Sequence, residues 1–185
     1  MLSRENQEIC ELFARALDYP SPSLVESAAD CAQRLAGSFP SIAEPMQSFV
    51  TFAASQTPEA LEELYSQTFD MTPATTFYFG YQLFGDNPKR SAFMVTLEEA
   101  YQADGFSSGR ELADHLGVLL RFLGIARDAD FVTPLLQECI LPTLEKMEAI
   151  LKKDKNAYGL VISALKAFLQ QVSRKLVKTG GVSNV

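Results

Sequence analysis

The chain has 185 residues, of which 47% are hydrophobic and 21% are charged, and its formal net charge at pH 7 is −7. This length and composition predict one globular domain that folds around a single core without disulfides or a structural metal. The acidic balance argues against nucleic acid and anionic membranes as partners, because both bind clusters of Lys and Arg. It favours a basic partner.

Capping residues and apolar positions at helical spacing predict four helices before residue 70. Their expected N-terminal signals, in chain order, are Ser3, Ser21-Pro22, the capping box Ser41-Ile42-Ala43-Glu44, and Thr57-Pro58. The first helix is expected to stop before Pro20, because Pro disfavours helix at the preceding residue. The second is expected to end at Gly37.

A short aromatic segment follows, made of Phe77, Tyr78, Phe79, Tyr81 and Phe84. An apolar run of this length is compatible with either a strand or a helix. We expect a helix, because no other part of the sequence offers a sheet partner.

Four further helices are predicted after residue 86. The first begins at Asn87-Pro88, and the second carries a leucine stripe that ends at Gly124. The last two are long, with apolar positions over residues 131–151 and 158–176. A kink is expected at Pro142.

These nine helices predict an all-α, single-domain bundle over residues 1–185, with residues 179–185 as a flexible tail. No apolar run is long enough for a membrane span, and residues 1–8 lack the apolar core of a signal peptide, so we expect a cytoplasmic protein. The cysteines form no CxxC pair and are expected to be buried free thiols: Cys10, Cys31 and Cys139.

The chain is poor in residues that carry catalysis. His115 is its one histidine, so a two-histidine metal site is excluded. The sequence contains no HExxH, GxGxxG, GxxxxGK[ST] or GxSxG motif. We therefore expect no enzyme activity, no metal and no cofactor.

One acidic cluster remains open to two interpretations. If a helix begins near Arg110, the spacing places Glu111, Asp114 and His115 on one face. These residues either cap the leucine-striped helix or form a surface that binds the backbone and basic side chains of a peptide. Asp86 is likewise either a turn residue or part of that surface.

Four motifs in order resemble a known family. They are Tyr65-Ser66-Gln67-Thr68-Phe69-Asp70; Phe84-Gly85-Asp86 with Lys89-Arg90; Met94, Leu97, Tyr101 and Gly105; and Glu111-Leu112-Ala113-Asp114-His115-Leu116 with Phe122-Leu123. They are similar to motifs of the TorD/DmsD/NarJ family of redox-enzyme maturation chaperones, and most similar to its NarJ-like, nitrate reductase delta branch. The chain has Ala113 and Gly117 where the family has prolines, which loosens the backbone there.

The resemblance implies an all-helical, cytoplasmic, non-catalytic chaperone without a cofactor of its own, acting as a monomer or weak dimer. Its partner would be the N-terminal leader, or leader remnant, of a molybdenum-cofactor (molybdopterin) oxidoreductase catalytic subunit, held during cofactor insertion and before any twin-arginine export. The client-peptide-binding residues carried over from the family are Asp86, Glu111, Asp114, His115, Tyr65, Phe69 and Tyr101. The alternatives are a helical nucleotide- or small-molecule-binding protein, including a hydrolase that uses the acidic cluster, and a structural subunit of a redox complex.

Overall fold

The computed structural model describes the backbone of residues 2–180 and the side chains of residues 2–176. Within this range the chain forms nine continuous helical segments and no strand, which confirms the predicted all-α bundle. Two of the segments contain a π-helical stretch, labelled η. The elements are α1 (Arg4–Ala16), α2 (Leu24–Ser38), α3 (Pro40–Ala54), α4 (Pro58–Tyr65) continuing as η1 (Ser66–Asp70), α5 (Phe79–Phe84), α6 (Pro88–Ala103), α7 (Leu116–Ile125), α8 (Ala129–Pro134) continuing through η2 (Leu135–Ile140) into α9 (Leu141–Lys153), and α10 (Tyr158–Gly180).

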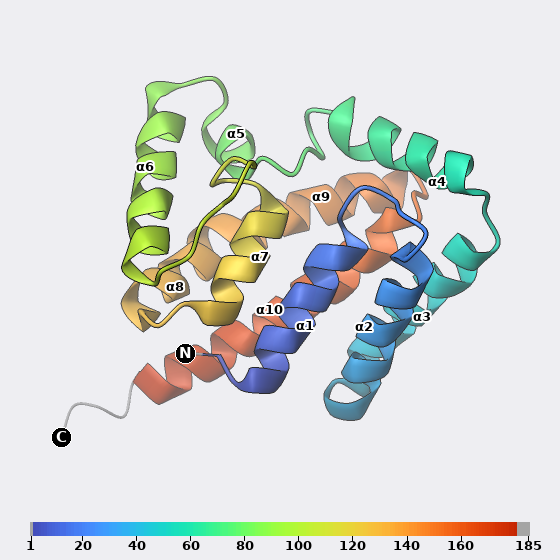
Figure 1. Cartoon of the computed structure of the whole chain (residues 1–185), viewed down its shortest axis with the longest axis horizontal. Helices are drawn as coiled ribbons and strands as arrows, with labels where there is room; N and C mark the ends of the chain where they lie inside the picture. Colours follow the sequence, from blue (N-terminus) through green and yellow to red (C-terminus); the bar gives the residue numbers. More distant parts are fainter. Residues whose placement is uncertain (1, 181–185) are drawn as a thin grey trace.

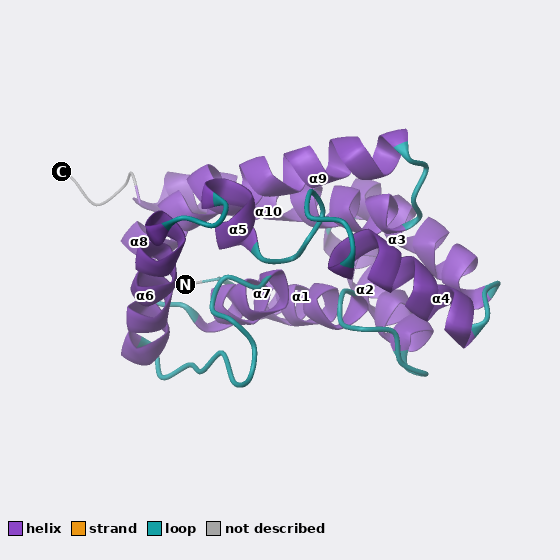
Figure 2. Cartoon of the chain, turned by 90° about the horizontal axis from the view of Figure 1, so that it is seen from above, coloured by secondary structure: helices purple, strands orange, loops and turns teal. Residues whose placement is uncertain are grey.

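The long helix α10 runs through the middle of the bundle, with α1, α3 and α9 against it (Figure 1). Its apolar positions recur every three or four residues, so one face is buried along most of its length. Phe168 shows how the layers meet: its ring lies 5.8 Å from that of Phe13 in α1 and 5.5 Å from that of Phe39 before α3. Helices α6 and α4 lie at opposite ends of the molecule (Figure 2). No helix in the described part of the chain is long and apolar enough to cross a membrane.

Several predicted helix starts are confirmed by their caps. The side-chain oxygens of Ser3, Thr57 and Asn87 accept hydrogen bonds from backbone N–H groups in the first turns of α1, α4 and α6, at 3.3, 3.3 and 3.0 Å. The capping box at residues 41–44 is wrong. Helix α3 begins earlier, at Pro40, because the fixed φ of proline suits a first helical turn and the buried Phe39 anchors the entry.

Near Pro142, where a kink was expected, the helix contains a π-helical turn that ends just before the proline. In η2 the N–H of Leu141 donates to the carbonyl of Leu136, five residues back rather than four. The extra residue in this turn separates α8 from α9 without interrupting the helical segment. At the other end of the chain, the backbone of Thr179 and Gly180 continues α10, and residues 181–185 of the predicted tail lie outside the described range.

The aromatic segment is a helix only from Phe79 onward. Tyr78 instead pairs with His115 in an isolated antiparallel bridge. Phe79 N–H donates to the carbonyl of Asp114 at 2.9 Å, and Leu116 N–H donates to the carbonyl of Phe77 at 2.8 Å. The expectation that this segment has no β partner was therefore wrong. The partner is the chain entering α7, which sequence patterns alone do not identify.

Candidate functional site

The loop of residues 105–115 joins α6 to α7 and carries most of the acidic cluster. A helix beginning near Arg110, the condition for a shared face, does not form; α7 begins only at Leu116. Gly105 and Gly109 adopt φ values of +70° and +73°, which turn the chain in a way that other residues rarely allow. After the turn at Ala113 and Asp114, the bridge to Tyr78 holds His115, the residue before α7, in an extended conformation. Glu111, Asp114 and His115 consequently do not share a helix face.

Asp114 is 0% exposed and is held by Arg90 of α6. Arg90 Nε lies 2.9 Å from Oδ2 of Asp114, and Nη2 lies 3.4 Å from Oδ1. The guanidinium carbon of Arg90 also lies 5.8 Å from the ring centres of both Tyr78 and Tyr81. A Cβ at Gly80 would come within 2.6 Å of Oδ2 of Asp114, so only glycine leaves room for this carboxylate against α5. The ion pair therefore fixes the end of the 105–115 loop to α5 and α6.

His115 is the N-cap of α7. Its Nδ1 accepts a hydrogen bond of 3.1 Å from Gly117 N–H, so this nitrogen must be unprotonated for the cap to form. The ring is half-buried, with edge contacts to Phe77 and Tyr78 at 5.6 and 5.4 Å between ring centres. Burial lowers the pKa of His115; nearby Arg121 acts in the same direction.

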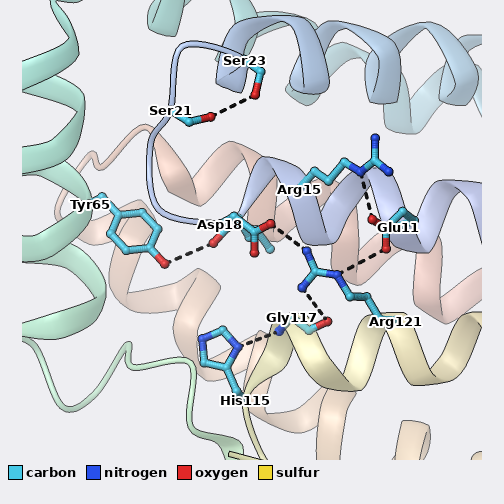
Figure 3. A network of polar contacts seen from close by, with 10 residues as sticks. Glu11, Arg15, Asp18, Ser21, Ser23, Tyr65, His115, Gly117 and Arg121 are labelled. Carbon is cyan, nitrogen blue, oxygen red and sulfur yellow. Dashed lines mark hydrogen bonds and ion pairs between the residues drawn. The ribbon is translucent and has the colours of Figure 1, made fainter. Parts of the chain in front are cut away.

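Arg121 connects this region to the end of α1 (Figure 3). Its Nη2 lies 2.7 Å from Oδ2 of Asp18, and its Nε lies 3.4 Å from Oε2 of Glu11. Its Nη1 donates to the carbonyl of Gly117 at 3.4 Å, one turn earlier in α7. The first turn of α7, which His115 caps, is thereby fixed to α1. This contact was missed, since a separation of 103 residues between Arg121 and Asp18 leaves no local signal.

Three of the expected site residues are core aromatics beneath the surface. Tyr65 donates through its hydroxyl to the carbonyl of Leu17 at 3.2 Å, and Tyr101 to the carbonyl of Ala113 at 2.7 Å. The ring of Phe69 stacks on that of the buried Phe77 at 3.9 Å. Tyr65, Phe69 and Tyr101 therefore support the surrounding backbone rather than reach the surface.

Asp86 and Glu111 are the exposed members of the expected set. Glu111 Oε1 accepts hydrogen bonds from the Tyr78 hydroxyl at 3.1 Å and from Leu112 N–H at 2.9 Å. Asp86 lies in the turn between α5 and α6, where its side chain makes no hydrogen bond or ion pair with the described residues. The structure thus brings Glu111, Asp114 and His115 together around Tyr78, whereas no hydrogen bond or ion pair in the described part of the chain joins Asp86 to them.

A groove of about 450 Å³ between α6 and the 105–115 loop was not predicted from the sequence. It is lined by Met94, Val95 and Leu112 and by the carboxylates of Glu98, Glu99 and Glu111. In the sequence, the adjacent Glu98 and Glu99 look like ordinary solvent-exposed residues of a helix and give no indication of a groove. Within the described residues, no three Cys, His, Asp or Glu side chains lie close enough together to hold a metal ion.

A family model described as the nitrate reductase delta subunit matches residues 37–175. The chain belongs to this family. The match confirms the resemblance read from the four motifs, and it includes the 105–115 loop and all seven expected site residues. The chain is also similar to a curated protein of Bacillus subtilis (strain 168), named as a probable nitrate reductase molybdenum cofactor assembly chaperone NarJ. The two are 28% identical over 142 residues, which cover 76% of each chain.

Proposed function

We propose that this protein is a cytoplasmic, non-catalytic chaperone that assembles a molybdenum-cofactor oxidoreductase. It binds the N-terminal leader or leader remnant of the catalytic subunit, keeps the subunit competent for cofactor insertion, and delays any export through the twin-arginine pathway. Family membership and the named function of the Bacillus subtilis relative support the assembly role. It acts as a monomer or a weak dimer.

The observation that best supports peptide binding is the exposed position of Glu111 on a fixed segment of backbone. Its carboxylate is exposed, but the backbone around it is fixed by the hydrogen bond from Tyr101 to Ala113 and by the ion pair of Asp114 with Arg90. An acid held on a rigid frame binds a basic group with little loss of conformational entropy. This arrangement suits a basic N-terminal peptide in an acidic protein.

The seven expected residues then divide into two roles. Asp86, Glu111 and the accessible edge of His115 contact the client peptide. Asp114, Tyr65, Phe69 and Tyr101 hold the contacting residues in place from inside the core.

The test is affinity purification of the tagged protein from its native host, followed by mass spectrometry and metal analysis. The chaperone role predicts recovery of a molybdoenzyme catalytic subunit that lacks its molybdenum cofactor. Recovery of the complete, cofactor-loaded enzyme in fixed stoichiometry would instead identify a structural subunit. Recovery of no molybdoenzyme subunit would contradict the proposal. Light scattering of the purified protein measures its oligomeric state.

A further inference from the structure

The outer face of α6 is largely exposed. Of its 16 residues only Leu97 and Tyr101 are buried. Val95 is 57% exposed, although it is apolar and lies in the middle of the helix. Several of the helix positions that line the groove each lie three or four residues from another, so they form one stripe along that face: Ser91, Val95, Glu98, Glu99 and Gln102. These residues face the groove together with Glu111, Leu112 and Ala113 of the 105–115 loop.

The 105–115 loop returns beside this stripe and closes one side of the groove. Leu112 projects from the loop with 46% of its surface exposed, opposite Met94 and Val95 of α6. Apolar side chains that converge from two elements favour the burial of further apolar side chains. The groove volume of about 450 Å³ lies within the range of protein binding pockets.

Three carboxylates surround this apolar floor, and no Lys or Arg is among the described residues that line it. Glu98 uses Oε1 to accept from the Ser108 hydroxyl at 2.9 Å, and Glu111 uses Oε1 to accept from Tyr78 and Leu112. In each case the second oxygen is left without a partner in the described part of the chain. Glu99 has no hydrogen bond or ion pair there at all. The two anchored carboxylates are oriented without being neutralised.

We propose that this groove binds an apolar, positively charged peptide segment, with apolar side chains over Val95 and Leu112 and Lys or Arg side chains on Glu98, Glu99 and Glu111. The three uncompensated negative charges beside exposed apolar surface are complementary to that chemistry. The stripe from Ser91 to Gln102 is about 16 Å long at the helical rise, which matches about three turns of a helical partner. The identification of this segment as part of the client's N-terminal peptide rests on the function proposed above.

The test is a titration of fluorescently labelled peptides into the whole protein at low and high salt. Two probes are used: the N-terminal peptide of the co-purifying catalytic subunit, and a model helical peptide of Lys and Leu at amphipathic spacing. Glu99→Gln is expected to weaken both complexes about tenfold at low salt, because one charge-assisted contact is lost. The effect is expected to shrink in high salt, which screens exposed charges. Leu112→Ser is expected to weaken binding at both salt concentrations, because it removes apolar contact.

Glu145→Gln is the matched control, since Glu145 is exposed on α9, outside the groove, and the substitution makes the same charge change. A model peptide with Gln in place of Lys should bind weakly and show no sensitivity to Glu99→Gln, as expected for a coupled pair. Circular dichroism melts of each variant confirm that it is folded.

The outcomes separate the two proposals. If the client peptide binds tightly and neither Glu99→Gln nor Leu112→Ser changes its affinity, the groove is not the binding site. That result would leave the proposed chaperone role unaffected. Groove-dependent binding of the Lys–Leu peptide without binding of the client peptide would keep the groove and overturn the proposed client. Failure of both peptides to bind the wild-type protein would overturn both.

Discussion

The buried carboxylate of Asp114 is held by the guanidinium of Arg90 through two hydrogen bonds, of 2.9 and 3.4 Å, from a residue 24 positions earlier in the chain. Arg90 is itself covered by Tyr78 and Tyr81, so the pair lies between the 105–115 loop and the start of α6. Asp114, which the sequence suggested as a peptide contact, is thereby a structural connection beneath the proposed peptide-binding surface.

Replacing Asp114 with Asn is expected to lower the free energy of unfolding by about 3 kcal/mol, because Arg90 loses its anion in a largely buried site. Urea denaturation measures the change. Asp86→Asn is the control, since Asp86 is exposed and its replacement should alter stability by less than about 0.5 kcal/mol. Equal stabilities for the two variants would show that the ion pair does not contribute.

Gly80→Ala is expected to destabilise the protein by about 1–3 kcal/mol, because the added methyl group would lie 2.6 Å from Asp114 Oδ2 and 3.1 Å from Cγ of Arg90. Gly37→Ala is the matched control in helix α2, where nothing lies within 4 Å of the added Cβ. There the same change should stabilise by about 0.5–1 kcal/mol. The two melting temperatures should therefore move in opposite directions; a shift of both in one direction would contradict this packing.

Protonation of His115 is expected to destabilise the fold in mildly acidic solution. Burial, together with the nearby Arg121, lowers the pKa of His115 in the folded state and outweighs the carboxylates of Glu111, Asp18 and Asp114, which raise it. The unfolded chain then takes up the proton first, near pH 6.5, so stability falls as the pH decreases from about 7 towards the folded-state pKa.

The variant that isolates this effect is His115→Asn, since Asn also caps helices but does not titrate. The difference in stability between pH 7 and pH 5.5 should be larger in the wild type than in His115→Asn. His115→Ala should additionally lose about 0.5–2 kcal/mol at pH 7, because the Gly117 N–H loses its acceptor. The pH prediction fails if wild type and His115→Asn have parallel stability curves.

Glu148 is expected to stabilise the packing of α9 on α10 at neutral pH. It is 8% exposed and is bound by Lys152 at 2.7 Å, by Lys166, and by the Ser163 hydroxyl at 2.5 Å. Burial alone would raise the pKa of Glu148, but these partners outweigh it and lower the pKa to about 2. Its contribution is thus present above the unfolded-state pKa near 4.3 and is lost as the pH falls towards 2.

Glu148→Gln should therefore cost about 1.5–3 kcal/mol at pH 7 and progressively less in acid. Glu145→Gln, on an exposed position of the same helix, should cost almost nothing. Chemical denaturation at pH 7 and pH 3 gives both values, and a cost that stays constant between them would refute the charge-based explanation.

The sequence predicted features that depend on neighbouring residues and missed those that depend on distant ones. Ser3, Thr57 and Asn87 were correct as caps because each bonds to a backbone N–H two or three residues later. A helix beginning near Arg110, the condition for the shared face, does not form, because residues 77–79 hydrogen-bond to residues 114–116 and the extended His115 directly precedes α7.

The candidate site divides in the same way. The motifs correctly indicated that Glu111, Asp114 and His115 belong to one region, but not that Asp114 is buried against Arg90. The groove beside α6 was missed because it forms only where the loop places Leu112 opposite Val95 of α6. The spacing of residues in the sequence does not predict which distant segments come together in this way. Burial, rather than residue type, separates the residues that can touch a partner from those that support them.

The bridge between Tyr78 and His115 also has a consequence for motion. Backbone hydrogen bonds at the bridge join the two ends of the segment formed by residues 79–114, which contains α5, α6 and the 105–115 loop. Within this segment, the first half of α6 packs mainly on α5, and none of its residues before Leu97 is buried. A segment with few buried contacts opens at lower free energy than a core helix. Backbone amides from Ser91 to Thr96 should accordingly exchange with deuterium well before those of α10, and occupation of the groove should slow them selectively.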